Sequence, residues 1–111
     1  MGASAEFVSW MREQFAPLGA AVSDSVFFGG RDFRYHGQQF AWVIGSTLYL
    51  RVDDGTRAEF EAEGAAPFSY ETKKGTVLVR KFYTAPEFLL DDPEQMLVWA
   101  RKAIDAAGRA G

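Results

Sequence analysis

Two pairs of turn residues divide the segment 27–52 into short β-strands. The pair His36-Gly37 suits a two-residue type I′ hairpin turn, and Gly45-Ser46 suits a type II′ turn with glycine at its first central position. A further strand over 22–28 precedes them, and Gly29-Gly30 predicts a bend or bulge after it. The strands between the turns are rich in aromatic and β-branched residues, and they cover 33–35, 39–44 and 47–52. The pattern therefore predicts a β-meander.

A second hairpin and three helices are expected around this meander. Strands over 68–72 and 76–83 flank a turn at Lys73-Lys74-Gly75. Ser4 predicts the cap of a first helix, which Pro17 and Gly19 end. Asp54 is the expected N-cap of a short helix that Gly64 closes. The last helix starts with a capping box, for which the residues are Asp92, Pro93 at the first helical position and Gln95.

Length and composition limit the architecture to one domain over residues 1–111. With 48% apolar residues the chain can build a core, and without cysteine it has neither disulfides nor Cys–zinc sites. The first residues lack the pattern of a signal peptide, and no apolar run approaches the ~20 residues of a membrane span. We therefore predict a soluble, cytoplasmic α+β domain. Its meander and hairpin are expected to form an antiparallel sheet, against which the N-terminal and C-terminal helices pack.

The third strand predicts a sheet that is covered on both sides. Phe40, Trp42 and Ile44 are expected on one face, and Ala41 and Val43 on the other. On the following strand, Tyr49 and Arg51 alternate with leucines and valine. If those apolar residues face the core, Tyr49 and Arg51 face outward.

The net charge of −3 is distributed unevenly along the chain. Segments 26–52 and 70–83 hold seven basic residues and two acidic ones, whereas the remainder holds five basic and thirteen acidic residues. One interpretation is ordinary solvation of strand faces; the other is a mildly basic sheet face that meets an acidic partner. On the second interpretation, the candidate partner-binding residues are Arg34, Tyr49, Arg51, Arg80 and Lys81.

No residue pattern indicates catalysis. His36 is the only histidine, and its place beside Gly37 fits a tight turn. The carboxylate pairs Asp53-Asp54 and Asp91-Asp92 each precede an expected helix, where capping accounts for them without a metal. We therefore predict a protein that is not an enzyme and that has no metal or cofactor.

The order of several short motifs resembles the N-terminal domain of the TfoX/Sxy family. These motifs are Phe28-Gly29-Gly30, Tyr49-Leu50 before Asp53, Asp92-Pro93-Glu94 and Trp99-Ala100-Arg101. The resemblance implies an antiparallel sheet packed by helices. It also implies a relation to regulators of natural competence, which act with the cyclic-AMP receptor protein at promoters. Full-length regulators of the family carry a second, helical C-terminal domain, and the resemblance here covers the N-terminal domain alone.

Three hypotheses of function remain from the sequence. The first is a regulatory protein-interaction module whose partner is a cyclic-AMP-receptor-type regulator or RNA polymerase, as the resemblance implies. The second is direct nucleic-acid binding through a basic and aromatic sheet face, against which the negative net charge argues. The third is a small-ligand-binding domain. Homodimerisation through a strand edge or an apolar face stays open.

Overall fold

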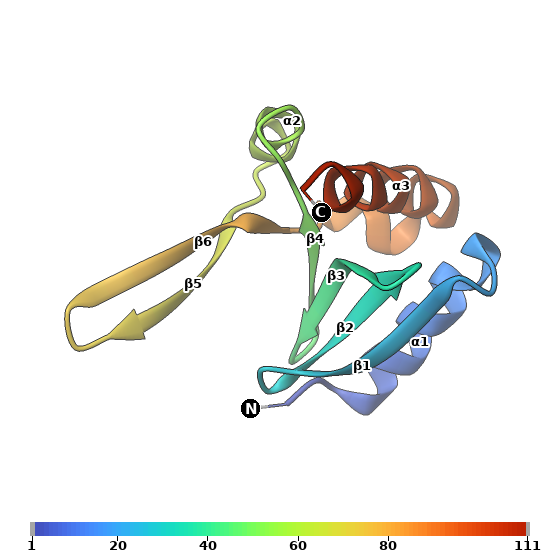
Figure 1. Cartoon of the computed structure of the whole chain (residues 1–111), viewed down its shortest axis with the longest axis horizontal. Helices are drawn as coiled ribbons and strands as arrows, with labels where there is room; N and C mark the ends of the chain where they lie inside the picture. Colours follow the sequence, from blue (N-terminus) through green and yellow to red (C-terminus); the bar gives the residue numbers. More distant parts are fainter. Residues whose placement is uncertain (1, 111) are drawn as a thin grey trace.

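The computed structural model describes residues 2–110, and its first four strands run up and down as a meander (Figure 1). They are β1 (Val22–Phe27), β2 (Gly30–Tyr35), β3 (Gln38–Ile44) and β4 (Thr47–Arg51), and each pairs antiparallel with the next. His36 and Gly37 have φ values of 50° and 81°, and Gly45 has φ 59°. These are the positive values that the two hairpin turns require, so the meander and its turns are confirmed.

The Phe28-Gly29 pair is a third two-residue hairpin turn, not the predicted bend or bulge. Phe28 and Gly29 have φ values of 42° and 75°, and Phe27 pairs with Gly30 across the turn. Gly30 already belongs to β2. A Cβ atom there would lie 2.2 Å from the carbonyl oxygen of Val43 and 2.9 Å from Nε1 of Trp42. The close approach of β3 therefore requires glycine at position 30.

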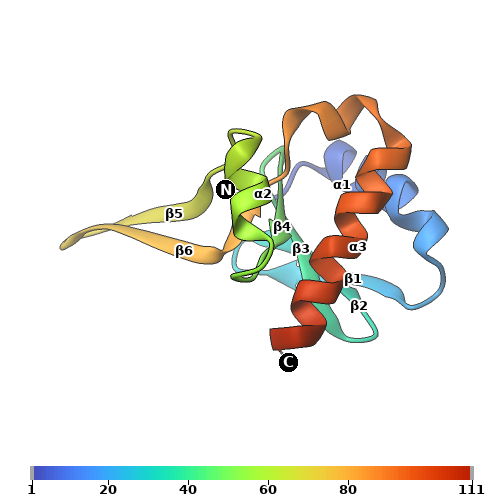
Figure 2. The ribbon, with the colours of Figure 1, turned by 90° about the horizontal axis from the view of Figure 1, so that it is seen from above.

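The second hairpin completes a six-stranded sheet. Its strands are β5 (Pro67–Thr72) and β6 (Gly75–Thr84), and the sheet order is β1-β2-β3-β4-β6-β5. All neighbouring strands are antiparallel, which confirms the predicted sheet. Figures 1 and 2 show the far half of the β5–β6 hairpin projecting from the rest of the molecule. β1 and β5 are the two edge strands.

The long helices cover one face of the sheet (Figures 1 and 2). α1 (Ala5–Phe15) begins at Ser4, whose hydroxyl accepts a hydrogen bond from the N–H of Phe7, and α3 (Pro93–Ala110) begins after Asp92. The Asp92 carboxylate accepts a hydrogen bond from the N–H of Gln95 at 3.1 Å. The Asp92 N–H donates to Leu89 O, so only half of the predicted capping box forms.

A short helix and two 3-10 helices complete the fold. They are α2 (Arg57–Ala62), η1 (Ala16–Leu18) and η2 (Glu87–Asp91). The turn before α2 is capped by Asp53, not by Asp54 as predicted: the Asp53 carboxylate accepts hydrogen bonds from Gly55 N at 3.0 Å and Thr56 N at 3.1 Å. Asp54 does not accept these two hydrogen bonds. Its carboxylate forms an ion pair with Arg57 instead.

A β-bulge in β3 corrects the predicted faces of that strand. Phe33 pairs with Ala41 and Arg34 pairs with Gln39, so Phe40 is the extra residue. Phe40 consequently lies on the helix-covered face with Ala41, and its ring centroid is 5.2 Å from that of Phe15 in α1. Trp42 lies on the opposite face. Both faces of β3 are nevertheless covered, as predicted.

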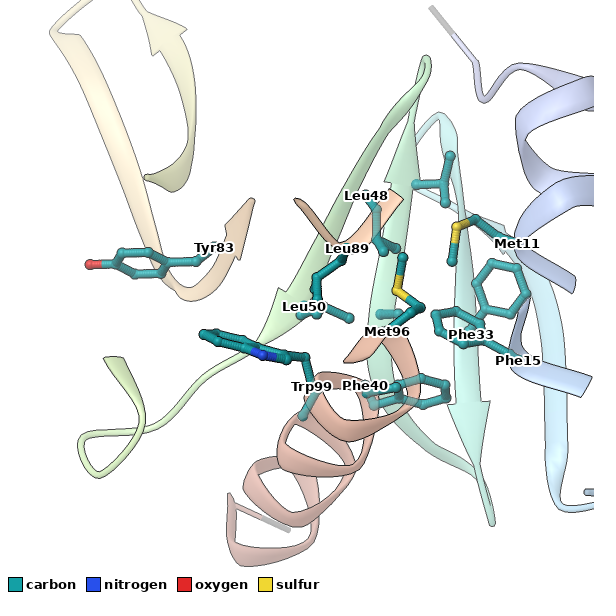
Figure 3. Packing of buried hydrophobic residues seen from close by; sticks show 14 of the residues in the cluster. Met11, Phe15, Phe33, Phe40, Leu48, Leu50, Tyr83, Leu89, Met96 and Trp99 are labelled. Carbon is teal, nitrogen blue, oxygen red and sulfur yellow. The ribbon is translucent and has the colours of Figure 1, made fainter. Parts of the chain in front are cut away.

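The main core lies between the sheet and the helices (Figure 3). Aromatic rings meet edge to face within it, with Phe15 5.1 Å from Phe33 and Phe60 4.9 Å from Trp99. Its largest fully buried apolar side chains are Tyr83, Phe15, Phe33, Phe40, Phe60, Met11, Leu50, Leu89 and Met96. The core therefore uses one face of the sheet and leaves the other for a separate aromatic cluster.

Candidate binding groove

The face of the sheet opposite the helices carries a cluster of aromatic side chains around Trp42. The register places Trp42 of β3 beside Tyr49 of β4, and Arg51 of β4 beside Phe82 of β6. Trp42 is only 6% exposed and Phe82 only 3%. These side chains alternate with the core residues of the same strands, so the sheet buries apolar groups on both faces.

Both edge strands of the sheet reach the same tryptophan ring. Phe27 of β1 lies 5.5 Å from Trp42 between ring centroids, and Phe68 of β5 lies 4.7 Å from it. The indole N–H of Trp42 also donates a hydrogen bond to the carbonyl oxygen of Phe27 at 3.1 Å. The sheet is therefore curled around Trp42, with its first and last strands converging on the open face.

This curl leaves a groove of about 490 Å³ between the β1–β2 turn and the β5–β6 hairpin. Phe28 is 81% exposed and Tyr70 is 48% exposed, so aromatic surface is accessible along it. Its lining residues are Phe27, Phe28, Gln39, Trp42, Phe68, Tyr70, Val79, Lys81 and Phe82. Its lining side chains are mainly apolar, and the polar groups are the Gln39 amide, the Lys81 ammonium and the Tyr70 hydroxyl.

Most of the cations without an ion pair within residues 2–110 lie on β4 and the β5–β6 hairpin, and Lys81 is the one that lines the groove. The chain has twelve lysines and arginines, of which Arg12, Arg31, Arg34, Arg57, Lys102 and Arg109 form ion pairs. Within residues 2–110, five of the other six lie on β4 or the β5–β6 hairpin, and the sixth is Arg101 of α3. The five are Arg51, Lys73, Lys74, Arg80 and Lys81. The local excess of positive charge is therefore not neutralised by neighbouring carboxylates.

Arg51 is held at the groove by an aromatic ring rather than by an acid. Its Cζ atom lies 5.8 Å from the centroid of the Phe82 ring. Its Nε is buried, and within residues 2–110 it has no hydrogen-bond partner. The guanidinium also forms no ion pair within the described residues, so it keeps an uncompensated positive charge beside the groove.

A fully buried carboxylate supports the floor of the groove. Asp32 of β2 accepts hydrogen bonds from Ser25 Oγ at 2.8 Å, Arg34 Nε at 2.9 Å and Gln39 Nε2 at 3.2 Å. These donors compensate its burial and orient Gln39, which lines the groove. The sequence interpretation missed Asp32, although an acidic residue between two arginines in an aromatic strand was a signal.

The five partner-binding residues that the sequence predicts lie in different environments in the structure. Lys81 lines the groove and Arg51 adjoins it. Arg80 is exposed on β6 outside the lining, whereas Arg34 is tied to Asp32 at 2.8 Å. Tyr49 is half-buried, with its ring 5.3 Å from that of Phe68, and burial raises the pKa of its hydroxyl.

The sequence interpretation did not select the aromatic residues that shape the accessible surface. Phe28, Phe68 and Tyr70 lie on a turn and on an edge strand, where apolar side chains usually pack into a core. The exposure of Tyr70 depends on how far the β5–β6 hairpin projects, and that of Phe28 on how the β1–β2 turn is placed; no local pattern encodes either.

A second cavity lies elsewhere on the described part of the chain, but it lacks the positive charge of the groove. This larger cavity of about 680 Å³ lies beside η2 and contains Glu63, Glu87 and the exposed Phe88, with no cation in its lining. No group of three His, Cys, Asp or Glu side chains that could hold a metal occurs within residues 2–110. None of the helices in this part of the chain is long and apolar enough to cross a membrane. The groove is the stronger candidate because aromatic surface and unpaired cations converge there.

Fold and groove together define an α+β domain with a curled antiparallel sheet whose open face carries a largely apolar groove. The model of the TfoX N-terminal domain matches residues 13–107, and the chain belongs to that family. No match to this chain was found among curated proteins.

Proposed function

We propose that this chain is a non-enzymatic regulatory module that binds a partner protein through the groove. The observation that supports it is the convergence of exposed aromatic rings with cations that have no ion pair within residues 2–110. Aromatic side chains and arginine supply most of the binding energy at protein interfaces, and complementary charge sets the rate and orientation of association.

Membership of the TfoX N-terminal domain family suggests the class of partner. The resemblance described above implies a cyclic-AMP-receptor-type regulator or RNA polymerase, and a role in transcription inside the cytoplasm. The Lys81 ammonium in the groove and the neighbouring Arg51 guanidinium would orient this protein on an acidic surface of such a partner, because no carboxylate occurs among the described residues that line the groove.

Crosslinking inside the native cells, followed by purification of the tagged protein and mass spectrometry, tests this proposal. Recovery of a receptor-type regulator or of RNA polymerase is expected, and the Arg51→Glu/Lys81→Glu variant should lose it. Substitution of Lys102 is avoided in the control because Lys102 forms an ion pair with Glu59. Arg101→Glu is the control for each single variant, Arg51→Glu and Lys81→Glu, since Arg101 is an exposed cation of α3 that does not line the groove.

Two results would contradict the regulatory proposal. One is recovery of the same partners by the wild type and by the double variant, which would show that the partner does not bind at the groove. The other is recovery of no transcription protein by the wild type. Direct binding to nucleic acid is tested in parallel by nuclease treatment before purification, because a nucleic-acid bridge would then be lost.

A further inference from the structure

We infer that the groove binds an extended acidic peptide segment of a partner protein, anchored by one aromatic or large aliphatic side chain. This inference rests on the proposed function and specifies the chemistry of the partner. It is carried by three properties of the groove: an apolar floor, a one-signed charge and a free strand edge.

The apolar floor fits a single anchoring side chain. Trp42 and Phe82 form a nearly buried base, while Phe28 and Tyr70 remain exposed at the sides. A side chain that enters between them buries its own surface and that of the two exposed rings. The volume of about 490 Å³ accommodates a large side chain and the peptide backbone beside it.

The charge around the groove selects an acidic peptide. No carboxylate lines it, and Lys81 is its one charged lining residue. Arg51 adds a guanidinium whose Nε has no partner within residues 2–110, and Lys73 and Lys74 form the hairpin turn. Glu71, the one acid of the hairpin, already accepts a hydrogen bond from Thr76 Oγ1 at 2.6 Å. Carboxylates of a peptide would pair with the Lys81 ammonium and the Arg51 guanidinium, neither of which forms an ion pair within residues 2–110.

The strand edge beside the groove fits an extended backbone. β5 is the last strand of the sheet, so its outer edge has no strand partner within the described chain. Phe68 and Tyr70 of this strand line the groove. A peptide that pairs with β5 would place alternate side chains on the same face as these rings, as in strand addition to a sheet edge.

The arrangement of the rings favours a peptide over single-stranded nucleic acid. Bases stack on flat aromatic faces that are open to solvent. Here the Trp42 ring meets Phe27 and Phe82 edge to face, with interplanar angles of 77° and 65°, and Phe68 is tilted by 59° to it. The largest ring, Trp42, is nearly buried. The surface therefore offers a slot for a side chain rather than a platform for successive bases.

Selection from a displayed library of random twelve-residue peptides on the immobilised protein tests this inference. We expect the selected peptides to be enriched in Asp and Glu and to share one aromatic or large aliphatic position. A selected peptide, synthesised with a fluorophore, should bind the Lys81→Glu variant at least about tenfold more weakly. Phe28→Ala should weaken it similarly, because the exposed ring lies at the groove, and Arg101→Glu should leave its affinity unchanged.

Several outcomes would overturn the inference. One is a selection that yields no peptide bound better by the wild type than by Lys81→Glu and Phe28→Ala. A basic or purely apolar consensus is another. Binding of a random twenty-nucleotide single-stranded DNA that Lys81→Glu abolishes, without any selected peptide, would assign the groove to nucleic acid. A homodimer in light scattering that Lys81→Glu dissociates would assign it to a second copy. Circular dichroism establishes that each variant is folded.

The library and the crosslinking experiment can fail independently. If a transcription protein is recovered and lost in the double variant while no acidic peptide is selected, the regulatory function stands and the peptide inference is wrong. If acidic peptides are selected while no transcription protein is recovered, the groove chemistry stands and the regulatory function is wrong.

Discussion

At the scale of single residues, the open face of the sheet depends on two positions, Gly30 and Asp32, at which a substitution would disturb closely packed neighbouring atoms. Gly30 faces the backbone of β3, and Asp32 sits among three side-chain donors beneath the groove. A Cβ at position 30 would meet backbone that cannot move aside, and the Asp32 carboxylate is fully buried. Both therefore give predictions in which the surrounding atoms, rather than residue propensity, determine the effect.

Gly30→Ala should destabilise the protein by about 3 kcal/mol, because the new Cβ would lie 2.2 Å from a backbone oxygen of β3. Gly37→Ala is the control. Gly37 has a positive φ of 81° but open space around it, so that substitution should cost only about 1–2 kcal/mol. Urea unfolding followed by circular dichroism measures both. Equal costs would show that crowding by β3 is unimportant.

Asp32→Asn should destabilise the protein by about 2 kcal/mol, because it removes the charge that the Arg34 guanidinium and Gln39 amide face. Ser25→Ala removes a single neutral donor from the same carboxylate and should cost about 1 kcal/mol. The same unfolding measurement compares them. A smaller effect of Asp32→Asn than of Ser25→Ala would contradict the supporting role of the ion pair.

At the scale of elements, the carboxylate of Asp24 joins one helix to two strands. Asp24 of β1 pairs with Arg12 of α1 and with Arg31 of β2, both at 2.8 Å. The hydrogen bond from Arg12 is the largest cause that holds the pKa of Asp24 below its usual range, and Arg31 lowers it further. The attachment of α1 to the sheet edge is therefore sensitive to acid.

The pH dependence of this contact follows from the direction of the shift. A carboxyl with a lower pKa in the folded state stabilises the fold fully above its unfolded pKa of about 3.9, and loses that contribution as pH falls through the folded value. The stability difference between wild type and Asp24→Asn should therefore be largest above about pH 5 and narrow below about pH 4. Urea midpoints between pH 7 and pH 2.5 measure it. A difference that stays constant would contradict the prediction.

At the scale of the whole molecule, burial is concentrated at the meander, and the hairpin extends beyond it. β3 and α3 contain many fully buried residues, whereas residues 69–76 are all exposed (Figure 1). Regions with little buried apolar surface open locally at low cost in free energy. The hairpin can therefore adapt to a bound peptide without disturbing the main core.

Hydrogen exchange should distinguish the exposed β5–β6 hairpin from the buried strand β3. Backbone amides of residues 69–76 should exchange fastest among the sheet residues, and those of β3 should be the most protected, because β3 is a central strand with four consecutive buried residues. Addition of a selected acidic peptide should slow exchange in β5 more than in β1. Equal protection of the hairpin and of β3 in the free protein would contradict this account.

Local signals in the sequence were sufficient for the elements and the fold class. The turns at His36-Gly37 and Gly45-Ser46, the caps at Ser4 and Asp92, and the family resemblance were all confirmed. These features depend on φ preferences and on hydrogen bonds within a few residues, which the local sequence specifies. The predictions were wrong by one residue at the Phe28-Gly29 turn and at the Asp53 cap, and they were wrong at the Phe40 bulge, where pairing with β2 altered the local geometry.

The sequence by itself determined which segments form strands and helices, and it directed attention to Arg51 and Lys81. Only the tertiary structure decided that Arg34 is neutralised by Asp32, that Tyr49 is half-buried, and that Phe28 and Tyr70 are exposed. The physical reason is that a groove is a property of separated segments. Phe27 and Phe68 meet at Trp42 because the sheet curls, and the curl arises from the summed twist of six strands and their irregular pairing.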